Sequence, residues 1–204
     1  ISDDLDGMRK IPTNIPNPER FTEYLGKPLT SIPDPFGTHS SYGEHMNSRL
    51  IGFLDSFGFE YEFVSSTAKY KSGSFNQTLL NVVQNYEKLM QLMLKNLGQE
   101  RQATYSPLMP ICQKTGKVLA DGVKSVNKEK GTVIYVNEFG EEVETEVTNG
   151  KCKLQWKIDF GARWQAFGVD YEIFGKDHAP NAPIYAEVCK ILGGVPPLNF
   201  VYEM

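Results

Sequence analysis

Apolar residues recur at intervals of three and four in two segments of the chain. In the first segment, 41–57, the apolar positions are Tyr42, Met46, Leu50, Phe53, Leu54 and Phe57. This spacing predicts an amphipathic helix that ends at Gly58. The second segment, 75–97, has the same period, with Ser74 placed to cap the start of a helix and Gly98 to stop it. One long helix is therefore predicted over 75–97.

Two other segments alternate between apolar and polar residues. Phe59, Tyr61 and Phe63 are separated by glutamates, which predicts a half-buried strand over 59–63. Residues 131–136 and 141–148 flank a turn that contains Gly140, and this pattern predicts a β-hairpin.

The remaining segments complete an alternation of helix and strand. Prolines make residues 11–37 an ordered loop with short helical turns. Further elements are predicted at 152–158 (extended), 159–167 (helix), 169–174 (strand) and 181–192 (helix). The pattern favours an α/β nucleotide-binding fold with a small antiparallel β insertion. We expect a catalytic part formed by 1–102 and 153–204, and a β-rich insertion at 103–152.

Composition restricts the class of protein. The 204 residues are 40% hydrophobic and 23% charged, as in ordinary globular proteins, and no run of 18 apolar residues occurs. The acidic opening and the three widely spaced cysteines predict a cytoplasmic protein without disulfides. A net charge of −4 argues against a surface built wholly for nucleic acid. The Lys-rich stretch 124–130 is a local RNA-binding candidate or a solvated turn.

The segment 171–181 combines a strand, a glycine and a charged tripeptide before a helix. Ligands of open α/β sheets bind at the carboxyl ends of strands, and a glycine lets them approach the backbone. Gly175, Asp177 and His178 are therefore candidates to line a nucleotide or amino-acid site. Alternatively, Asp177 or Asn181 caps the helix and His178 is a surface residue.

The segment 153–164 contains both tryptophans of the chain. Trp156 and Trp164 lie on either side of Asp159. Aromatic faces around a carboxylate suit an ammonium ligand. The alternative is that the tryptophans are core residues and Asp159 caps a helix.

The rest of the sequence predicts no further catalytic or metal-binding site. The acidic segment 2–7 could orient a polar substrate or Mg²⁺, but such loops are more often solvated. There is no phosphate-binding loop, dinucleotide fingerprint, serine nucleophile elbow or Cys-x-x-Cys pair. His39 and His45 are interpreted as surface and cap residues, and no metal site is predicted.

Several long motifs in register resemble the class I lysyl-tRNA synthetases. They lie at residues 2–12, 29–37, 105–110, 153–159 and 175–178. The resemblance is closest to the bacterial version whose insertion lacks a cysteine-rich zinc ribbon, because Cys112 stands alone where some relatives have a pair.

The resemblance implies a Rossmann-type catalytic domain that uses ATP and Mg²⁺ to convert lysine to lysyl-adenylate and transfers the lysine to tRNA(Lys). It implies no membrane association and leaves the oligomeric state open. By the resemblance, Trp156, Asp159 and Trp164 surround the lysine ammonium, and Gly175, Asp177 and His178 face the adenosine.

The family's two signature motifs, His-Ile-Gly-His-like and Lys-Met-Ser-Lys-Ser-like, do not occur in this sequence, so no catalytic residue is assigned. We expect this piece alone to have little aminoacylation activity. The alternatives are a class I synthetase for another amino acid, such as glutamate, and a non-catalytic RNA- or protein-binding module that retains the fold.

Overall fold

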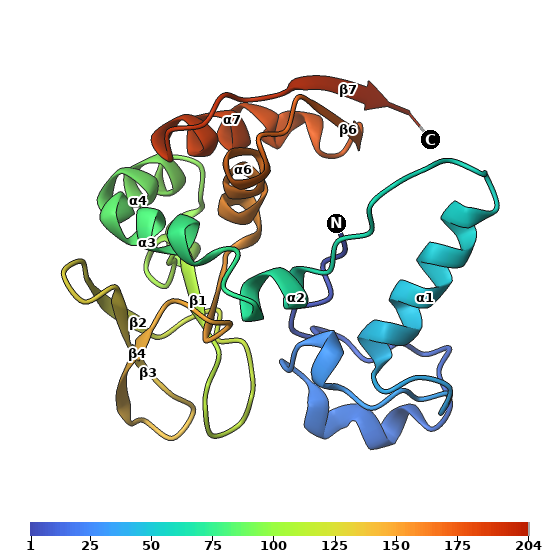
Figure 1. Cartoon of the computed structure of the whole chain (residues 1–204). Helices are drawn as coiled ribbons and strands as arrows, with labels where there is room; N and C mark the ends of the chain where they lie inside the picture. Colours follow the sequence, from blue (N-terminus) through green and yellow to red (C-terminus); the bar gives the residue numbers. More distant parts are fainter. Residues whose placement is uncertain (204) are drawn as a thin grey trace.

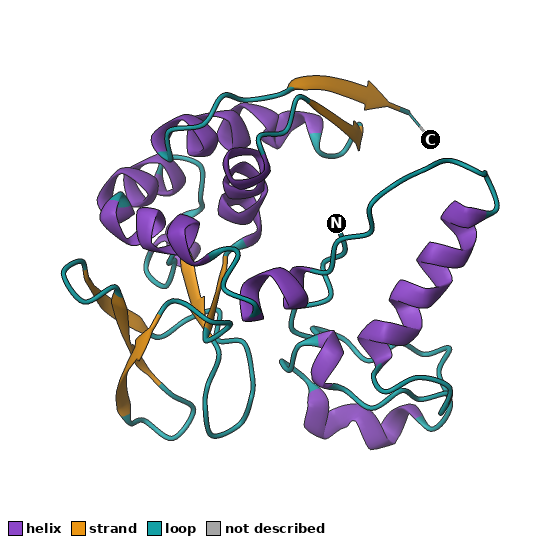
Figure 2. Ribbon diagram, viewed as in Figure 1, coloured by secondary structure: helices purple, strands orange, loops and turns teal. Residues whose placement is uncertain are grey.

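The computed structural model describes residues 1–203, which form a mixed α/β structure (Figures 1 and 2). Its elements are η1 (Pro18–Tyr24), η2 (Leu29–Ser31), α1 (Tyr42–Asp55), α2 (Ser66–Lys71), α3 (Asn76–Gln84), α4 (Tyr86–Leu94), α5 (Gln99–Gln102), β1 (Leu108–Pro110), β2 (Val123–Asn127), β3 (Thr132–Val136), β4 (Glu142–Glu146), β5 (Cys152–Leu154), α6 (Trp156–Phe167), β6 (Tyr171–Gly175), η3 (Ala179–Asn181), α7 (Ala182–Ile191) and β7 (Leu198–Tyr202). None of the described helices combines the length and the apolar character needed to cross a membrane.

The first predicted helix is confirmed as α1. It begins after Ser41, whose hydroxyl accepts a hydrogen bond from the backbone N–H of Glu44 at 3.1 Å. The predicted strand over 59–63 is wrong. These residues form a loop between α1 and α2, and Phe59 is 75% exposed. An alternating segment becomes a strand only where a neighbouring strand pairs with its edge and other residues cover its apolar face, and the described residues provide no paired strand for this segment.

The predicted helix over 75–97 is two helices, α3 and α4, which meet at Asn85. The backbone of Asn85 leaves the helical region at φ −101° and ψ 17°, and its side-chain amide donates to the carbonyl of Asn81 at 3.1 Å. Asparagine competes with the helix ladder by bonding to nearby backbone. Ser74 does not cap α3, which follows Phe75 directly.

Helix α6 begins earlier than predicted. Its first residue is Trp156 instead of residue 159, because the side chain of Gln155 accepts the backbone N–H of Lys157 at 3.1 Å and so caps the helix. The extended segment before it is correspondingly shorter, and only β5 is a strand. The strand β6 and the helix α7 lie within two residues of their predicted bounds.

Three small sheets complete the fold. The predicted hairpin is confirmed as β3 and β4, and β2 extends it to an antiparallel sheet with the order β2-β3-β4. Strands β1 and β5 pair antiparallel. Strands β6 and β7 pair parallel, with α7 as their connection. Parallel strands joined by a helix form a βαβ unit; β7 was not predicted.

One buried core joins α3, α4 and α6 to the β2-β3-β4 sheet. It includes Leu79 of α3, Leu89 of α4, Val133 of β3 and Ile158 of α6, all 0% exposed. In Figure 1 the β2-β3-β4 sheet lies below α3 and α4, whereas α1 stands on the opposite side of the molecule from them.

Candidate functional site

Aromatic side chains gather where α6, β6 and α7 meet. Trp164, Phe174 and Tyr185 are buried there, and the partly exposed rings of Trp156 and Phe160 pack against them. The spacing of α6 explains this arrangement, because residues four apart lie on one helical face. The Phe160 and Tyr185 rings stack with their centroids 4.5 Å apart.

His178 lies against this cluster. The turn after β6 is closed by a hydrogen bond from the backbone N–H of His178 to the carbonyl of Gly175, at 2.9 Å. The imidazole centroid is 5.1 Å from that of Trp156 and 5.5 Å from that of Phe160. A Cβ at Gly175 would lie 2.6 Å from Oδ1 of Asp177, so the glycine accommodates the folded-back aspartate.

Two polar atoms in the cluster have no hydrogen-bond partner among residues 1–203. They are Nδ1 of His178 and the hydroxyl oxygen of Tyr185, and both are buried. Burial raises the pKa of Tyr185 to about 12, so the phenol stays protonated at neutral pH. Buried polar atoms are rarely left without a partner. These two atoms are therefore the groups of the cluster that remain available for a hydrogen bond to a ligand or to water, with the Asn181 side chain the neighbour of the Tyr185 hydroxyl.

The carboxylate of Asp159 makes its contacts away from the aromatic cluster, on a different face of α6. The hydroxyl of Tyr70 donates to its Oδ1 at 2.5 Å, and the guanidinium of Arg163 lies 2.5 Å from its Oδ2. Burial raises the pKa of Asp159, although Arg163 beside it opposes this shift. Arg163 also reaches Asp3 at 2.5 Å and Ser66 at 2.9 Å. The network fixes α6 to α2 and to the start of the chain.

Trp164 is 1% exposed, and its ring packs against the rings of Phe160 and Tyr185. Its indole N–H donates to Oε2 of Glu172 in β6 at 2.7 Å. Because a buried indole needs an acceptor, Glu172 fixes the orientation of the ring. Asp177, in contrast, is exposed, and its carboxylate lies 3.7 Å from Nε2 of His178.

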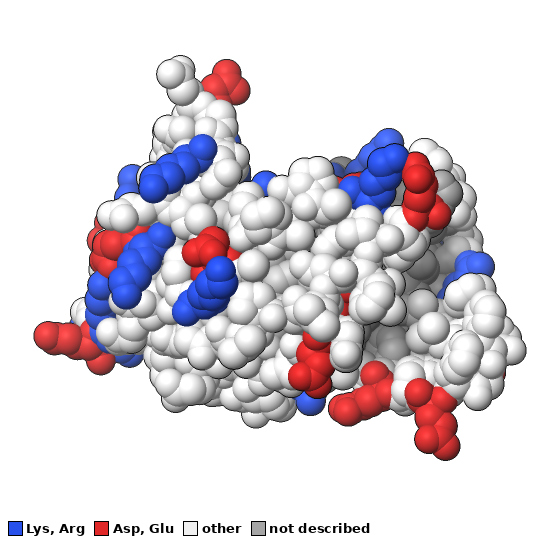
Figure 3. Space-filling model, turned by 90° about the horizontal axis from the view of Figure 1, so that it is seen from above, with Lys and Arg blue, Asp and Glu red and all other residues white. Residues whose placement is uncertain are grey.

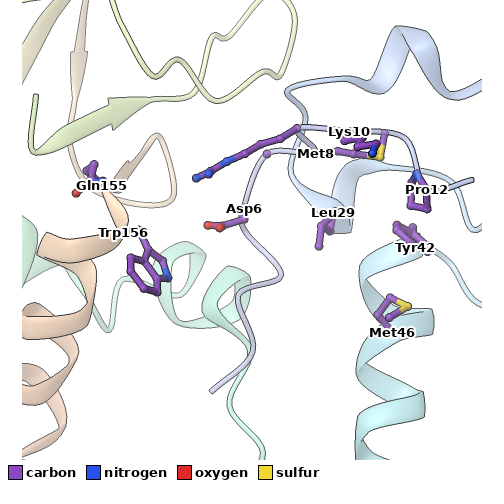
Figure 4. Close-up of a pocket in the computed structure, with 11 residues that line it drawn as sticks. Asp6, Met8, Lys10, Pro12, Leu29, Tyr42, Met46, Gln155 and Trp156 are labelled. Atoms are coloured by element: carbon purple, nitrogen blue, oxygen red, sulfur yellow. The ribbon is translucent and has the colours of Figure 1, made fainter. Parts of the chain in front are cut away.

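A cavity of about 700 Å³ opens beside Trp156 (Figure 4). In this view Trp156 lies on one side and Tyr42 and Met46 of α1 on the other, with Asp6 and Leu29 between them. The remaining lining residues are Gly7, Met8, Arg9, Lys10, Pro12 and Gln155. A second cavity of about 710 Å³ is lined by Trp164 and the loop that precedes β7.

The acidic N-terminal segment does not form a shared site. Asp3 pairs with Arg163, and Asp6 pairs with the buried Lys153. Asp4 is buried and accepts three hydrogen bonds, from the backbone N–H of Thr67 at 2.7 Å and from the side chains of Ser65 and Asn47. The three carboxylates thus have separate protein partners and are not directed at one ligand, although Asp3 and Asp6 remain partly exposed to solvent.

A second polar cluster lies in the loop before α1. Ligand atoms of Asp34, His39 and His45 all lie within 4.8 Å of one another. Asp34 accepts backbone N–H groups of residues 36, 38 and 39 at 2.8–3.1 Å, and although burial opposes them, these bonds lower its pKa far below the ordinary value. Two imidazoles and one carboxylate match the donor set of a zinc site with an open fourth position.

The structure brings together part of the predicted site. The aromatic cluster where α6, β6 and α7 meet contains or adjoins four of the predicted residues: Trp156, Trp164, Gly175 and His178. Asp159 makes its contacts on a different face of α6. Sequence analysis did not identify Tyr185 or the grouping of Asp34 with the two histidines. Tyr185 falls within the helix predicted over 181–192, but no pattern in the sequence indicated its unpaired hydroxyl.

Comparison with known proteins identifies relatives. Residues 1–204 match the family model described as tRNA synthetases class I (K). The chain is 57% identical over its whole length to the lysine–tRNA ligase of Rickettsia felis, 56% to that of Rickettsia bellii and 55% to that of Rickettsia prowazekii. It spans 39% of the length of each of these relatives.

Proposed function

The chain belongs to the family of class I tRNA synthetases (K), and from this membership we propose that its protein is a lysine–tRNA ligase. The observation that carries the proposal is the identity of 55–57% to lysine–tRNA ligases across all 204 residues. The proposed substrates are lysine, ATP and tRNA(Lys), and the proposed location is the cytoplasm.

The reaction has two steps. A carboxylate oxygen of lysine attacks the α-phosphorus of ATP, which forms lysyl-adenylate and releases pyrophosphate. A hydroxyl of the terminal tRNA adenosine then attacks the lysyl carbonyl, and AMP leaves. Such chemistry depends on positioning and on stabilisation of developing charge.

We propose that lysine binds at Trp156, His178 and Tyr185. The Trp156 face attracts an ammonium by a cation–π interaction. Nδ1 of His178, in the tautomer whose proton is on Nε2, and the hydroxyl oxygen of Tyr185 are acceptors that lack a partner within residues 1–203, and an ammonium has three N–H donors. The ligand would thus satisfy two buried atoms that the protein leaves unpaired.

Asp159 and Trp164 remain in the proposed lysine site as positioning residues. The bonds of Asp159 to Tyr70 and Arg163 hold α6 in place, and Trp164 supports the rings of Phe160 and Tyr185. A displacement of α6 would move Trp156, so both residues affect lysine binding indirectly.

We propose that the turn of Gly175, Asp177 and His178 faces the adenosine of ATP, so that His178 lies where the two substrates meet. Mg²⁺ would enter with the ATP phosphates. The acidic segment at residues 3–6 does not fit a resident Mg²⁺ site, because its three carboxylates have separate protein partners. The parallel pair β6-α7-β7 supports a Rossmann-type catalytic part formed by 1–102 and 153–204, with 103–152 inserted.

Aminoacylation by the full-length protein tests the proposal. Purified protein with ATP, Mg²⁺ and tRNA(Lys) should attach lysine and not glutamate. The Trp156→Ala variant should raise the KM for lysine about tenfold or more, since cation–π contacts in desolvated sites contribute about 2 kcal/mol. Charging with glutamate would support a synthetase of different specificity. No charging of any tRNA would support a non-catalytic module.

A further inference from the structure

Among the ion-paired lysines of residues 1–203, Lys153 alone is buried. Its side chain is 6% exposed, whereas the side chains of the other paired lysines are at least 34% exposed. On the face seen in Figure 3 the basic side chains lie at the surface, among acidic ones. Burial of an ammonium is unfavourable unless a partner compensates for the lost water, so the position of Lys153 requires an explanation.

Strand β5 places Lys153 on the side away from the core. Successive side chains of a strand point to opposite faces, and the two neighbours of Lys153, Cys152 and Leu154, both lie in the buried core. Lys153 therefore lies on the other face, where it lines a cavity of about 460 Å³ together with Met109 and Asp6. There its ammonium pairs with the carboxylate of Asp6.

Asp6 belongs to the walls of two cavities. It lines the cavity next to Lys153 and also the larger one of about 700 Å³ beside Trp156. In Figure 4 its carboxylate points toward the side on which Trp156 lies. Within residues 1–203 this carboxylate has no hydrogen-bond or ion-pair partner besides Lys153. A single side chain thus compensates for the charge of Asp6.

The backbone around Asp6 is held independently of Lys153. The carbonyl of Asp6 accepts the backbone N–H of Leu29 at 3.1 Å. Met8 makes two further backbone hydrogen bonds, at 2.8 and 2.9 Å, with the turn at residues 26–27. Loss of the Lys153 ammonium would therefore leave this loop in place and release only the carboxylate.

The substrates of the proposed reaction differ in charge. Lysine has an ammonium, whereas ATP and lysyl-adenylate have phosphates. A carboxylate without a partner would repel the phosphates and not the ammonium, and such repulsion is stronger in a partly buried cavity than in water. A change at Lys153 should therefore affect the nucleotide and spare the amino acid.

We propose that Lys153 is a positioning residue of the ligase reaction, which holds and neutralises the Asp6 carboxylate so that the adjoining site accepts the phosphates of ATP. The inference rests on the proposed function and adds a residue that acts on the substrate through Asp6. Asp159 does not depend on Lys153 in this way, because its carboxylate has Tyr70 and Arg163 as direct partners.

ATP–pyrophosphate exchange by the full-length protein, with tRNA(Lys) present, tests the proposal. Lys153→Met removes the charge and retains a long side chain. It should raise the KM for ATP by about tenfold or more, because like charges then face each other, and should leave the KM for lysine unchanged or lower. Lys153→Arg keeps the charge and should retain the wild-type KM for ATP.

A second substitution separates charge from structure. Lys153→Met/Asp6→Asn contains no uncompensated carboxylate and should restore the KM for ATP, which a merely structural role of Lys153 does not predict. Lys88→Met is the matched control. It removes an exposed lysine of α4 that has no ion pair within residues 1–203, and it should change neither KM.

The outcomes distinguish this inference from the proposed function. An unchanged KM for ATP in Lys153→Met refutes the role of Lys153 and leaves the proposed function intact. An equal rise of both KM values, a double variant no better than Lys153→Met, or loss of the folded circular dichroism spectrum in Lys153→Met also refutes it, because the pair would then serve the fold alone. Failure of the wild-type protein to activate lysine overturns both proposals.

Discussion

Asp159 illustrates how much of a residue's role depends on partners distant in sequence. Its neighbours Trp156 and Trp164 suggested an ammonium pocket, but the partners of its carboxylate are Tyr70, 89 positions away, and Arg163. A sequence pattern identifies side chains that could bind a ligand or react. It does not show which way a side chain points from a buried helix.

Substitution of Asp159 should therefore destabilise the fold as well as affect lysine binding. Asp159→Asn leaves the buried Arg163 without its buried carboxylate partner, and breaking such a pair costs about 3–5 kcal/mol. We expect a loss near 3 kcal/mol, because Asp3 still pairs with Arg163. Urea denaturation measures it. Asp177→Asn is the control, since its side chain is 78% exposed and should change stability by no more than about 0.5 kcal/mol. A stable Asp159→Asn variant would refute the structural role of the network.

The cluster of Asp34, His39 and His45 was not predicted, because 11 positions separate its first and last members along the sequence. We expect it to bind Zn²⁺. Protein purified without chelator should contain one equivalent more zinc by elemental analysis than the variant His39→Ala/His45→Ala, and chelation should lower the melting temperature of the wild type alone. Equal zinc content in the two proteins would contradict this expectation.

At the scale of elements, hydrophobic period predicted α1, the β3-β4 hairpin and α7 within a few residues. It failed at boundaries decided by single side chains, such as the Asn85 break and the Gln155 cap. It also failed at residues 59–63, where an alternating pattern has no partner strand among the described residues. The boundaries were missed because periodicity does not report which side chains bond to the helix backbone. Residues 59–63 were missed because periodicity reports which face is apolar and not what covers that face.

The packing of α6 on α7 provides a test at this scale. A Cβ at Gly161 would lie 2.4 Å from the carbonyl oxygen of Tyr185 and 2.6 Å from Cβ of Val188. Gly161→Ala should therefore push the helices apart and destabilise the protein by about 1–3 kcal/mol. Gly52→Ala in α1 meets nothing within 4 Å and should be neutral or stabilising by up to about 1 kcal/mol. Thermal denaturation of the two variants compares them, and equal melting temperatures would contradict the close approach of α6 and α7.

At the scale of the whole molecule, one core joins α3, α4 and α6 to the β2-β3-β4 sheet. Ion pairs of Asp3 with Arg163 and of Asp6 with Lys153 connect the N-terminal segment to α6 and β5. The sequence predicted the mixed α/β character of the chain and the β3-β4 hairpin in its middle section. It did not predict that residues 6–10, Tyr42 and Trp156 enclose one cavity, because that arrangement depends on how separate elements pack together.

The central claim is that Trp156, His178 and Tyr185 form the binding site for the activated lysine. Isothermal titration of the full-length protein with a non-hydrolysable lysyl-adenylate analogue, and with its glutamyl counterpart, tests it most directly. We predict one site per protein, a strong preference for the lysyl analogue, and at least tenfold weaker binding of that analogue to the Trp156→Ala variant. Equal binding of the two analogues, or unchanged affinity in the variant, would contradict the account.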